Sequence, residues 1–154
     1  MPIKLFRSGW DLSCRVNHID SESTEINSAD EYRINSITGV IIDCSIRVHK
    51  ELGPGLLERV YELCLLKELI SEGLFVKRQV ALPVIYKGEK IDIDFKIGLL
   101  VEDEVIVELK AVEAILPVHE AQLLTYLKLS GMRIGLLMNF NTKLLKDGIR
   151  RYIL

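Results

Sequence analysis

The chain lacks any apolar run that approaches the roughly 18 continuous residues of a membrane-spanning helix. Its first residues, MPIKLFRSGWDLSCRVN, also lack the apolar centre of a secretory signal, so we expect a cytoplasmic protein. Neither a GxGxxG pattern nor a phosphate-binding loop of the P-loop type occurs. Nicotinamide or flavin binding therefore has no support in the sequence.

Cysteine is also scarce. The three cysteines, Cys14, Cys44 and Cys64, are odd in number and share no metal-ligand spacing. Cys44 and Cys64 fall on apolar helical positions, which predicts buried, reduced thiols and agrees with a reducing cytoplasm. With 49% hydrophobic and 27% charged residues, the 154-residue chain has the composition of one globular domain with its own core.

An excess of charge of one sign is missing as well, because the net charge is only −2. Composition alone therefore gives no general argument for nucleic-acid binding. Basic residues nevertheless gather in residues 128–154, where Asp147 is the single acidic residue and the local charge is +5. A solvated surface and a phosphate-binding patch both agree with this cluster. Its members are Lys128, Arg133, Lys143, Lys146, Arg150 and Arg151.

The chain divides into two parts near Ser36. Residues 18–36 are rich in Ser, Asp, Glu and Asn without a sustained period, so residues 1–35 are predicted to form an extension that is partly disordered or loosely docked. The folded domain is predicted over residues 36–154, with Ser36 as the N-cap of an amphipathic helix. The apolar positions of this helix are Ile37, Val40, Ile41, Cys44, Val48 and Leu52.

A second helix is predicted over residues 56–72, because Gly53-Pro54-Gly55 ends the first one and Gly73 suits a helix stop. Its predicted buried stripe consists of Leu57, Tyr61, Cys64, Leu65 and Leu69.

The pattern then changes from helical spacing to alternation. Strands are predicted over residues 75–86, 90–101 and 105–112, joined by tight turns, and the third, apolar on both faces, is expected in the centre of its sheet. Pro117 opens a helix that Gly131 closes, and residues 133–139 form a fourth strand that can lie parallel to the third. Residues 144–154 fit either a short helix or an edge strand. The order after the first helix, α-β-β-β-α-β, predicts an α/β fold, a mixed sheet flanked by helices.

Two charged residues interrupt the central strand. Alternation places Ile106, Glu108 and Lys110 on one face, and burying a lone carboxylate or ammonium costs several kcal/mol. One interpretation is an ion pair. The other is a metal site, because hard divalent ions bind carboxylate oxygens and a nearby lysine orients water.

Further polar groups stand on the predicted helices. Glu58 lies in the first turn of the second helix, where its negative charge either stabilises the helix N-terminus or contributes to a site. His119, Gln122 and Tyr126 share one face of the helix after Pro117. This stripe either faces solvent or lines a cleft beside the third strand.

Several ordered motifs now join these residues. The pattern GxxExxY occurs as Gly55, Glu58 and Tyr61. The others are ELGPG (51–55), RQVALPVIYKG (78–88), LLVEDEVIVELKAV (99–112), HEAQLLTYLKLSG (119–131) and LLKDGIRR (144–151). Over residues 36–154 the chain resembles the bacterial GxxExxY protein family, which belongs to the PD-(D/E)XK nuclease superfamily. The predicted element order is also the restriction-endonuclease-like core of that superfamily.

The resemblance implies a role for each of these residues. Glu108 and Lys110 match the (D/E)xK pair, so Glu108 would bind a metal and Lys110 would position the attacking water. Glu58 matches an acidic residue that the first core helix adds to the metal site. Gln122 and Tyr126 resemble the QxxxY element of RecB-like nucleases, which organises the site and contacts the DNA backbone. The implied reaction is hydrolysis of nucleic acid, with DNA as the expected substrate and Mg²⁺ or Mn²⁺ as the metal.

The chain departs from the family at Gly98, where the family pattern places a metal-binding aspartate. Asp92 and Asp94 share the face of Gly98 by alternation, but Asp94 is roughly 13 Å away along an extended strand. Glu102 is equally distant on the other side. Three hypotheses follow. The first is a nuclease that is weakened by the missing ligand. The second is an inactive nuclease-like module that binds nucleic acid or a protein partner, and the third is a homo-oligomer formed through the apolar helix 37–52.

Overall fold

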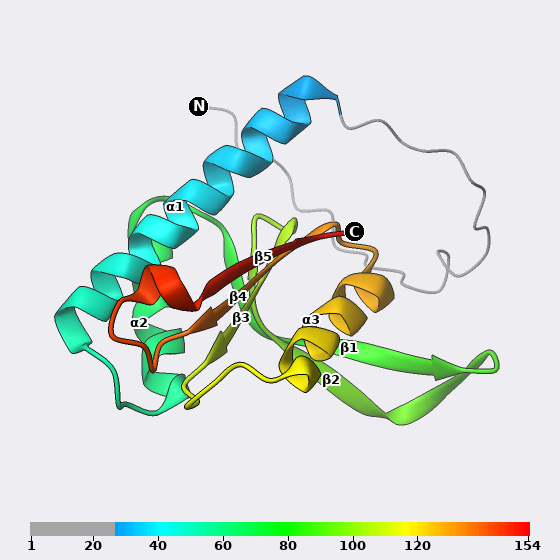
Figure 1. Cartoon of the computed structure of the whole chain (residues 1–154). Helices are drawn as coiled ribbons and strands as arrows, with labels where there is room; N and C mark the ends of the chain where they lie inside the picture. Colours follow the sequence, from blue (N-terminus) through cyan, green and yellow to red (C-terminus); the bar gives the residue numbers. More distant parts are fainter. Residues whose placement is uncertain (1–26) are drawn as a thin grey trace.

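A computed structural model of the chain describes residues 27–154, and Cys14 and the first 26 residues of the predicted extension lie outside it. After the first helix, the predicted order α-β-β-β-α-β is confirmed, with one more strand at the end (Figure 1). The elements are α1 (Ser28–Leu52), α2 (Glu58–Ser71), β1 (Val76–Tyr86), β2 (Glu89–Val101), β3 (Val105–Lys110), α3 (Pro117–Ser130), β4 (Ile134–Asn139), a short 3₁₀ helix (Leu145–Gly148) and β5 (Ile149–Ile153).

The first helix begins earlier than predicted. Its N-cap is Asn27, whose side chain accepts a hydrogen bond from the Ala29 amide at 3.2 Å, and not Ser36. Residues 28–35 are therefore helical and are not part of an extension. The fully buried apolar positions start only at Ile37, because the first two turns are largely exposed to solvent and only the half-buried Ile34 packs against the core. They are tied to the body by an Arg33–Glu104 ion pair and by Arg151, which donates to Asn35.

The second helix begins at Glu58, and Leu57 is its N-cap. The prediction that Leu57 is buried was wrong, because this side chain is 78% exposed. Tyr61, Leu65 and Leu69 of the predicted stripe are fully buried, while Cys64 is only half-buried. The stripe thus starts one turn later than the apolar pattern suggests, since the residue before a helix does not follow the helical period.

The sheet has five strands in the order β1-β2-β3-β4-β5. β3 is its centre and pairs antiparallel with β2 and parallel with β4, as predicted. Both alternatives for residues 144–154 prove partly right, because the 3₁₀ helix leads into β5, an edge strand antiparallel to β4. Pro83 is tolerated because β1 is the other edge strand and its register shifts between Pro83 and Val84.

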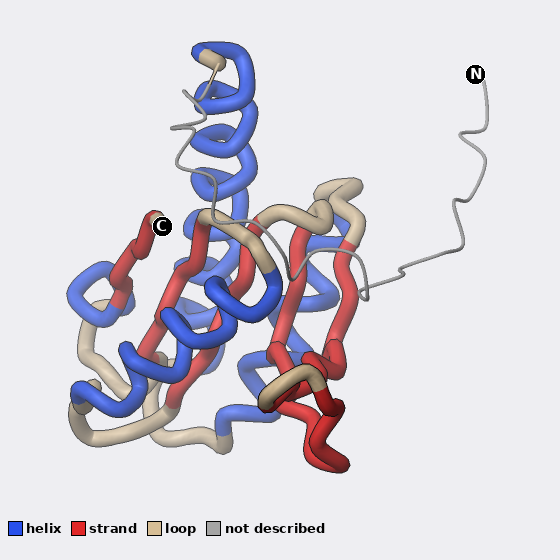
Figure 2. The backbone as a smooth tube through the Cα atoms, turned by 90° about the vertical axis from the view of Figure 1, so that its right-hand side faces the viewer, coloured by secondary structure: helices blue, strands red, loops and turns tan. Residues whose placement is uncertain are grey.

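Helices cover both faces of this sheet, α1 and α2 on one side and α3 on the other (Figures 1 and 2). Val105, Val107 and Leu109 of β3 point into the α1–α2 layer, whereas Ile106 points toward α3. Gly135 lets α3 approach closely, since a Cβ there would lie 2.8 Å from Leu123 Cδ1. The alternation of β3 therefore sends Glu108 and Lys110 to the side of α3.

The apolar face of α1 is used inside the domain. Ile37, Ile41, Cys44 and Val48 are buried in the core, so this face is not free to form a homo-oligomer. Cys44 is buried as predicted, and this burial raises the pKa of its thiol. None of the helices among residues 27–154 has the length and apolar character needed to cross a membrane.

Two neighbouring residues of α2 test this packing. Leu69 is fully buried and Ile70 is 55% exposed. We expect Leu69→Ala to lower the free energy of unfolding by about 2–5 kcal/mol, because it leaves a cavity. Ile70→Ala should change it by less than about 1 kcal/mol. Urea denaturation measures both, and equal losses would contradict the packing described.

Candidate metal and nucleic-acid site

Glu108 and Lys110 lie together at the end of β3. Glu108 is 5% exposed, and its Oε1 accepts a hydrogen bond from Lys110 Nζ at 2.8 Å. Its other oxygen, Oε2, is buried and has no hydrogen-bond partner among residues 27–154. A buried carboxylate oxygen without a partner is costly, so an ion pair with Lys110 does not by itself explain this glutamate.

The surroundings of Glu108 are electrostatically mixed. Burial raises the pKa of Glu108, the hydrogen bond and charge of Lys110 lower it, and the charge of Glu58 raises it again. The backbone amide of Gly98 also favours the ionised form. Glu58, Gly98 and Lys110 thus converge on one carboxyl group from α2, β2 and β3.

The end of β3 is held by Asn139, which the sequence did not single out. This buried side chain accepts from the Val112 amide at 3.1 Å and donates to the Val112 carbonyl at 2.8 Å. The Phe140 amide also donates to the Lys110 carbonyl at 2.8 Å. These bonds continue the β3–β4 pairing beyond the strand and position the backbone that carries Lys110.

Tyr61 sets the start of α2 and with it the position of Glu58. Its hydroxyl donates to the Gly53 carbonyl at 2.6 Å and accepts from the Leu56 amide at 3.1 Å. The ring is buried and stacks on Phe140 with a centroid distance of 4.6 Å. The tyrosine therefore holds the Gly53–Leu56 turn against the core, which fixes the first turn of α2.

Glu58 is solvent-exposed but its carboxyl group belongs to the same site. Partial desolvation of this carboxyl group by the surrounding protein is the largest cause of its raised pKa; Lys110 lowers that pKa, Glu62 raises it and His119 lowers it. Glu58 therefore interacts with β3 and α3 as well as with its own helix, so stabilising the helix N-terminus is not its single interaction among residues 27–154.

The polar stripe of α3 faces β3. Gln122 donates to the Tyr126 hydroxyl at 2.6 Å, and Tyr126 is buried with its ring 5.8 Å from that of Phe95. Burial raises the pKa of Tyr126, the Gln122 hydrogen bond lowers it, Glu108 raises it and Lys110 lowers it. His119 accepts from the Leu116 amide through Nδ1 at 3.1 Å, which leaves Nε2 as the protonated nitrogen of the neutral ring. The stripe thus lines the site.

Gly98 lies at the centre of these groups. A Cβ at this position would sit 3.7 Å from Glu108 Oε2, 3.6 Å from Glu62 Oε2 and 3.3 Å from the Val107 carbonyl oxygen. Alternation also breaks here, because Ile97 packs on the α3 side of the sheet and Leu99 on the α1–α2 side. The face of Gly98 therefore cannot be assigned by counting in twos from Asp92, which is exposed, or from Asp94.

Glu62 is a member of the site that the sequence interpretation missed. It is 5% exposed, and its carboxylate accepts from Arg78 Nε and, at 2.8 Å, from Gln79 Nε2. A signal was present, since Glu62 follows Glu58 by four residues and so shares its helix face. Its proximity to Gly98 has no such signal, because it depends on how α2 crosses β2.

Comparison with known proteins agrees with this arrangement. A family model described as the PD-(D/E)XK nuclease superfamily matches residues 35–152. The chain belongs to this superfamily. No curated protein and no solved structure matches it. The α/β fold with its mixed sheet is accordingly that of the restriction-endonuclease-like PD-(D/E)XK domains, and the chain is nuclease-like.

The carboxylate groups of the candidate site are of the chemical kind that binds divalent cations. Carboxylate oxygens are hard ligands, and the unpartnered Glu108 Oε2 provides one that no protein group among residues 27–154 satisfies. In number they fall short, since no three His, Cys, Asp or Glu side chains of the described residues are grouped to hold a metal ion as they stand. Gly98, which lies against Glu108, adds no side chain to this set.

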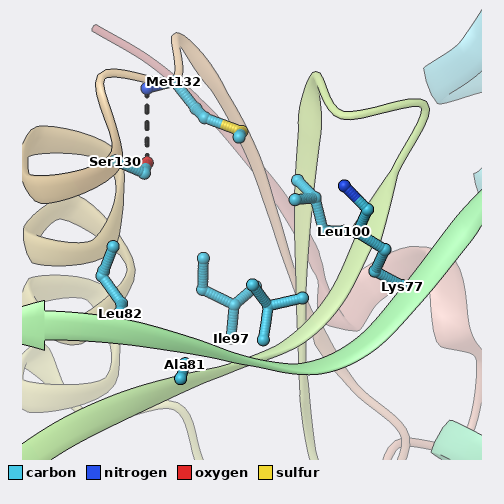
Figure 3. Close-up of a pocket in the computed structure, with 8 residues that line it drawn as sticks. Lys77, Ala81, Leu82, Ile97, Leu100, Ser130 and Met132 are labelled. Carbon is cyan, nitrogen blue, oxygen red and sulfur yellow. Dashed lines mark hydrogen bonds between the residues drawn. The ribbon is translucent and has the colours of Figure 1, made fainter. Parts of the chain in front are cut away.

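An apolar pocket of about 200 Å³ lies elsewhere, between the β1–β2 pair and the end of α3 (Figure 3). Its lining includes Leu82, Ile97, Leu100 and Met132 and none of the carboxylates of the PD-(D/E)XK site. This hollow therefore provides no metal ligands for the site.

Gly98→Asp should make stability depend on metal. Without metal, an aspartate against Glu62 and Glu108 adds like charge in a buried place, and we expect a loss of roughly 1–3 kcal/mol in the free energy of unfolding. Mn²⁺ should restore this stability and raise the Tm of Gly98→Asp more than that of the native chain, since a third carboxylate strengthens binding. Thermal unfolding in EDTA and in Mn²⁺ measures both effects.

Gly98→Asn is the matched control, because it adds nearly the same volume without the charge. Equal Tm values for the two variants in EDTA, with no Mn²⁺ response in either, would contradict the assignment of position 98 to the site.

Proposed function

We propose that this PD-(D/E)XK domain hydrolyses phosphodiester bonds of nucleic acid with the help of a divalent metal ion, at a rate limited by the loss of the aspartate at position 98. The observation that supports it most is Glu108: a buried carboxylate with one oxygen bound by Lys110 and the other unpartnered among residues 27–154. We place the chain in the GxxExxY branch of the superfamily on the basis of Gly55, Glu58 and Tyr61.

Each residue of the site has a proposed part. Glu108 and Glu58 would hold the cation, Mg²⁺ or Mn²⁺, through their carboxylates. Lys110, held against Glu108, would orient the attacking water and balance the charge that develops on the phosphate. Gln122 and Tyr126, joined by their hydrogen bond, would contact the nucleic-acid backbone beside it. A bound divalent ion would lower the pKa of a water molecule bound to it and would offset the negative charge of the phosphate.

A nuclease assay tests the proposal. We expect the native chain to cut DNA slowly with Mg²⁺ or Mn²⁺, and Gly98→Asp to cut faster because it restores a carboxylate. Glu108→Gln and Lys110→Met should each lower cleavage about 100-fold or more, the scale of a lost transition-state contact. Glu89→Gln, the same change at the exposed end of the β1–β2 hairpin, is the control and should leave cleavage unchanged.

Equal cleavage by the native chain and Glu108→Gln would overturn the mechanism. Cleavage by neither the native chain nor Gly98→Asp would favour the second function, an inactive nuclease-like module that binds nucleic acid or a protein partner. Gly98 supports that second function. The six basic residues within 128–154 support it as well, because all of them are exposed.

Salt dependence tests nucleic-acid binding separately. Arg150 forms an ion pair with Glu120, and Arg151 donates to Asn35, so both guanidinium groups are held on the surface near the end of the chain. We expect Arg150→Gln/Arg151→Gln to weaken DNA binding and to reduce the slope of log affinity against log salt by about 2, one for each lost phosphate contact.

The control is Lys50→Gln/Lys67→Gln, which removes two positive charges from α1 and α2. Equal slopes for the native chain and the arginine variant would place the DNA contacts elsewhere, and no binding at any salt concentration would leave a protein partner.

A further inference from the structure

We propose that Glu62 supplies the carboxylate oxygen that an aspartate at position 98 would otherwise bring to the metal site. This inference rests on the proposed function and names the residue by which this chain compensates for Gly98. The compensating group comes from a helix that packs beside the strand, and not from the aspartates of the strand itself.

The space beside Gly98, which a side chain would fill, lies next to two carboxylates. The point where a residue-98 Cβ would stand is 3.6 Å from Glu62 Oε2 and 3.7 Å from Glu108 Oε2. Both distances are ordinary van der Waals contacts, so an aspartate carboxylate would lie directly against these two oxygens. With glycine, the two carboxylates face the same small space with no side chain from position 98 between them.

Glu108 gives the second, independent argument. Its Oε2 is buried and unpartnered among residues 27–154, and it faces the space above Gly98. A neutral filling of this space by apolar atoms would leave that oxygen unsatisfied. A cation satisfies it, and Glu62 is the second carboxylate at the same place.

The position of Glu62 on α2 provides the third argument. Glu58 and Glu62 are one helical turn apart, and their charges interact. The start of α2, which Tyr61 holds against Gly53, therefore brings Glu58 toward Lys110 of β3 and Glu62 toward Gly98 of β2. With Glu108 they are the three carboxylates, from two elements, that a bound cation would draw together, since among the described residues no three such groups are close enough as they stand.

Arg78 and Gln79 explain how a third carboxylate is tolerated in the absence of metal. Arg78 offsets the charge of Glu62, and Gln79 donates to the Oε2 atom that faces Gly98. A carboxylate has about four lone-pair positions, so these two hydrogen bonds leave acceptor capacity for a cation. A purely structural ion pair would use the same two donors but would make no contribution to metal binding.

Direct measurement of Mn²⁺ binding distinguishes these roles. We expect Glu62→Gln to lower Mn²⁺ affinity at least about tenfold in the native chain, the smallest loss expected when support of a metal site is removed. In the Gly98→Asp background the same change should alter affinity by no more than about twofold, because the aspartate then supplies the oxygen. The electron paramagnetic resonance signal of free Mn²⁺ gives each affinity without reference to activity.

Glu68→Gln on the same helix is the matched control, because Glu68 pairs with Arg47 on α1, outside the site. Circular dichroism and Tm in EDTA establish that each variant is folded. If Glu62→Gln fails to fold, Glu62→Asp replaces it: the shorter side chain keeps a charge for Arg78 but withdraws from the space above Gly98, so Mn²⁺ affinity should still fall.

The outcomes separate the two proposals. Native Mn²⁺ binding that depends on Glu108 but is unchanged by Glu62→Gln overturns the role of Glu62 and leaves the proposed function standing. Binding by Gly98→Asp but not by the native chain overturns the role of Glu62 and the metal-assisted activity of the native chain as well. Absence of Mn²⁺ binding in both, or binding that Glu108→Gln does not weaken, overturns the proposed function together with this inference.

Discussion

The structure depends on burying the Glu108 carboxylate and the Lys110 ammonium at the end of a central strand. Such a pair is expensive to desolvate, and their single hydrogen bond satisfies only one of the two carboxylate oxygens. Elements on all sides surround this pair of charged groups. β2 and β4 pair with β3 on both sides, α2 brings Glu58 and Glu62, and α3 brings the Gln122–Tyr126 pair.

Rigid supports hold these polar groups in place. Tyr61 is buried, stacks on Phe140 and fixes the turn before Glu58, while Asn139 binds the segment that leaves β3. The GxxExxY pattern thus combines two kinds of residue: the tyrosine positions the helix start, and the glutamate faces the site. Neither side chain could replace the other, because the tyrosine must be buried in the core and the glutamate must reach the end of β3 from the solvent side.

Gly98 affects strand pairing and the candidate site differently. The sheet accepts glycine there without loss of pairing on either side, since Ile97 and Leu99 remain paired with Val80 and Arg78. The candidate site, in contrast, has no side chain at the point that lies 3.6 Å from Glu62 Oε2 and 3.7 Å from Glu108 Oε2. A PD-(D/E)XK fold is therefore compatible with a weakened or reorganised metal site, because the strand pairing on either side of Gly98 needs no side chain there, whereas metal binding would need one.

Most of the fold followed from the sequence by itself. Helical and alternating periods, with Gly53-Pro54-Gly55, Pro117 and Gly131 as boundaries, determined the element order and the central place of β3, since these signals are local. The same signals failed at two helix ends. The start of α1 at Ser28 was missed because its largely solvated first turns carry too few apolar residues to show a helical period, and Leu57 is exposed because it precedes its helix. The pairing of Glu108 with Lys110 was likewise readable from strand alternation. Only the tertiary structure decided that Glu62 stands beside Gly98 and that one Glu108 oxygen has no partner among residues 27–154, because both depend on how α2 packs across β2 and β3, a contact between segments far apart in the chain.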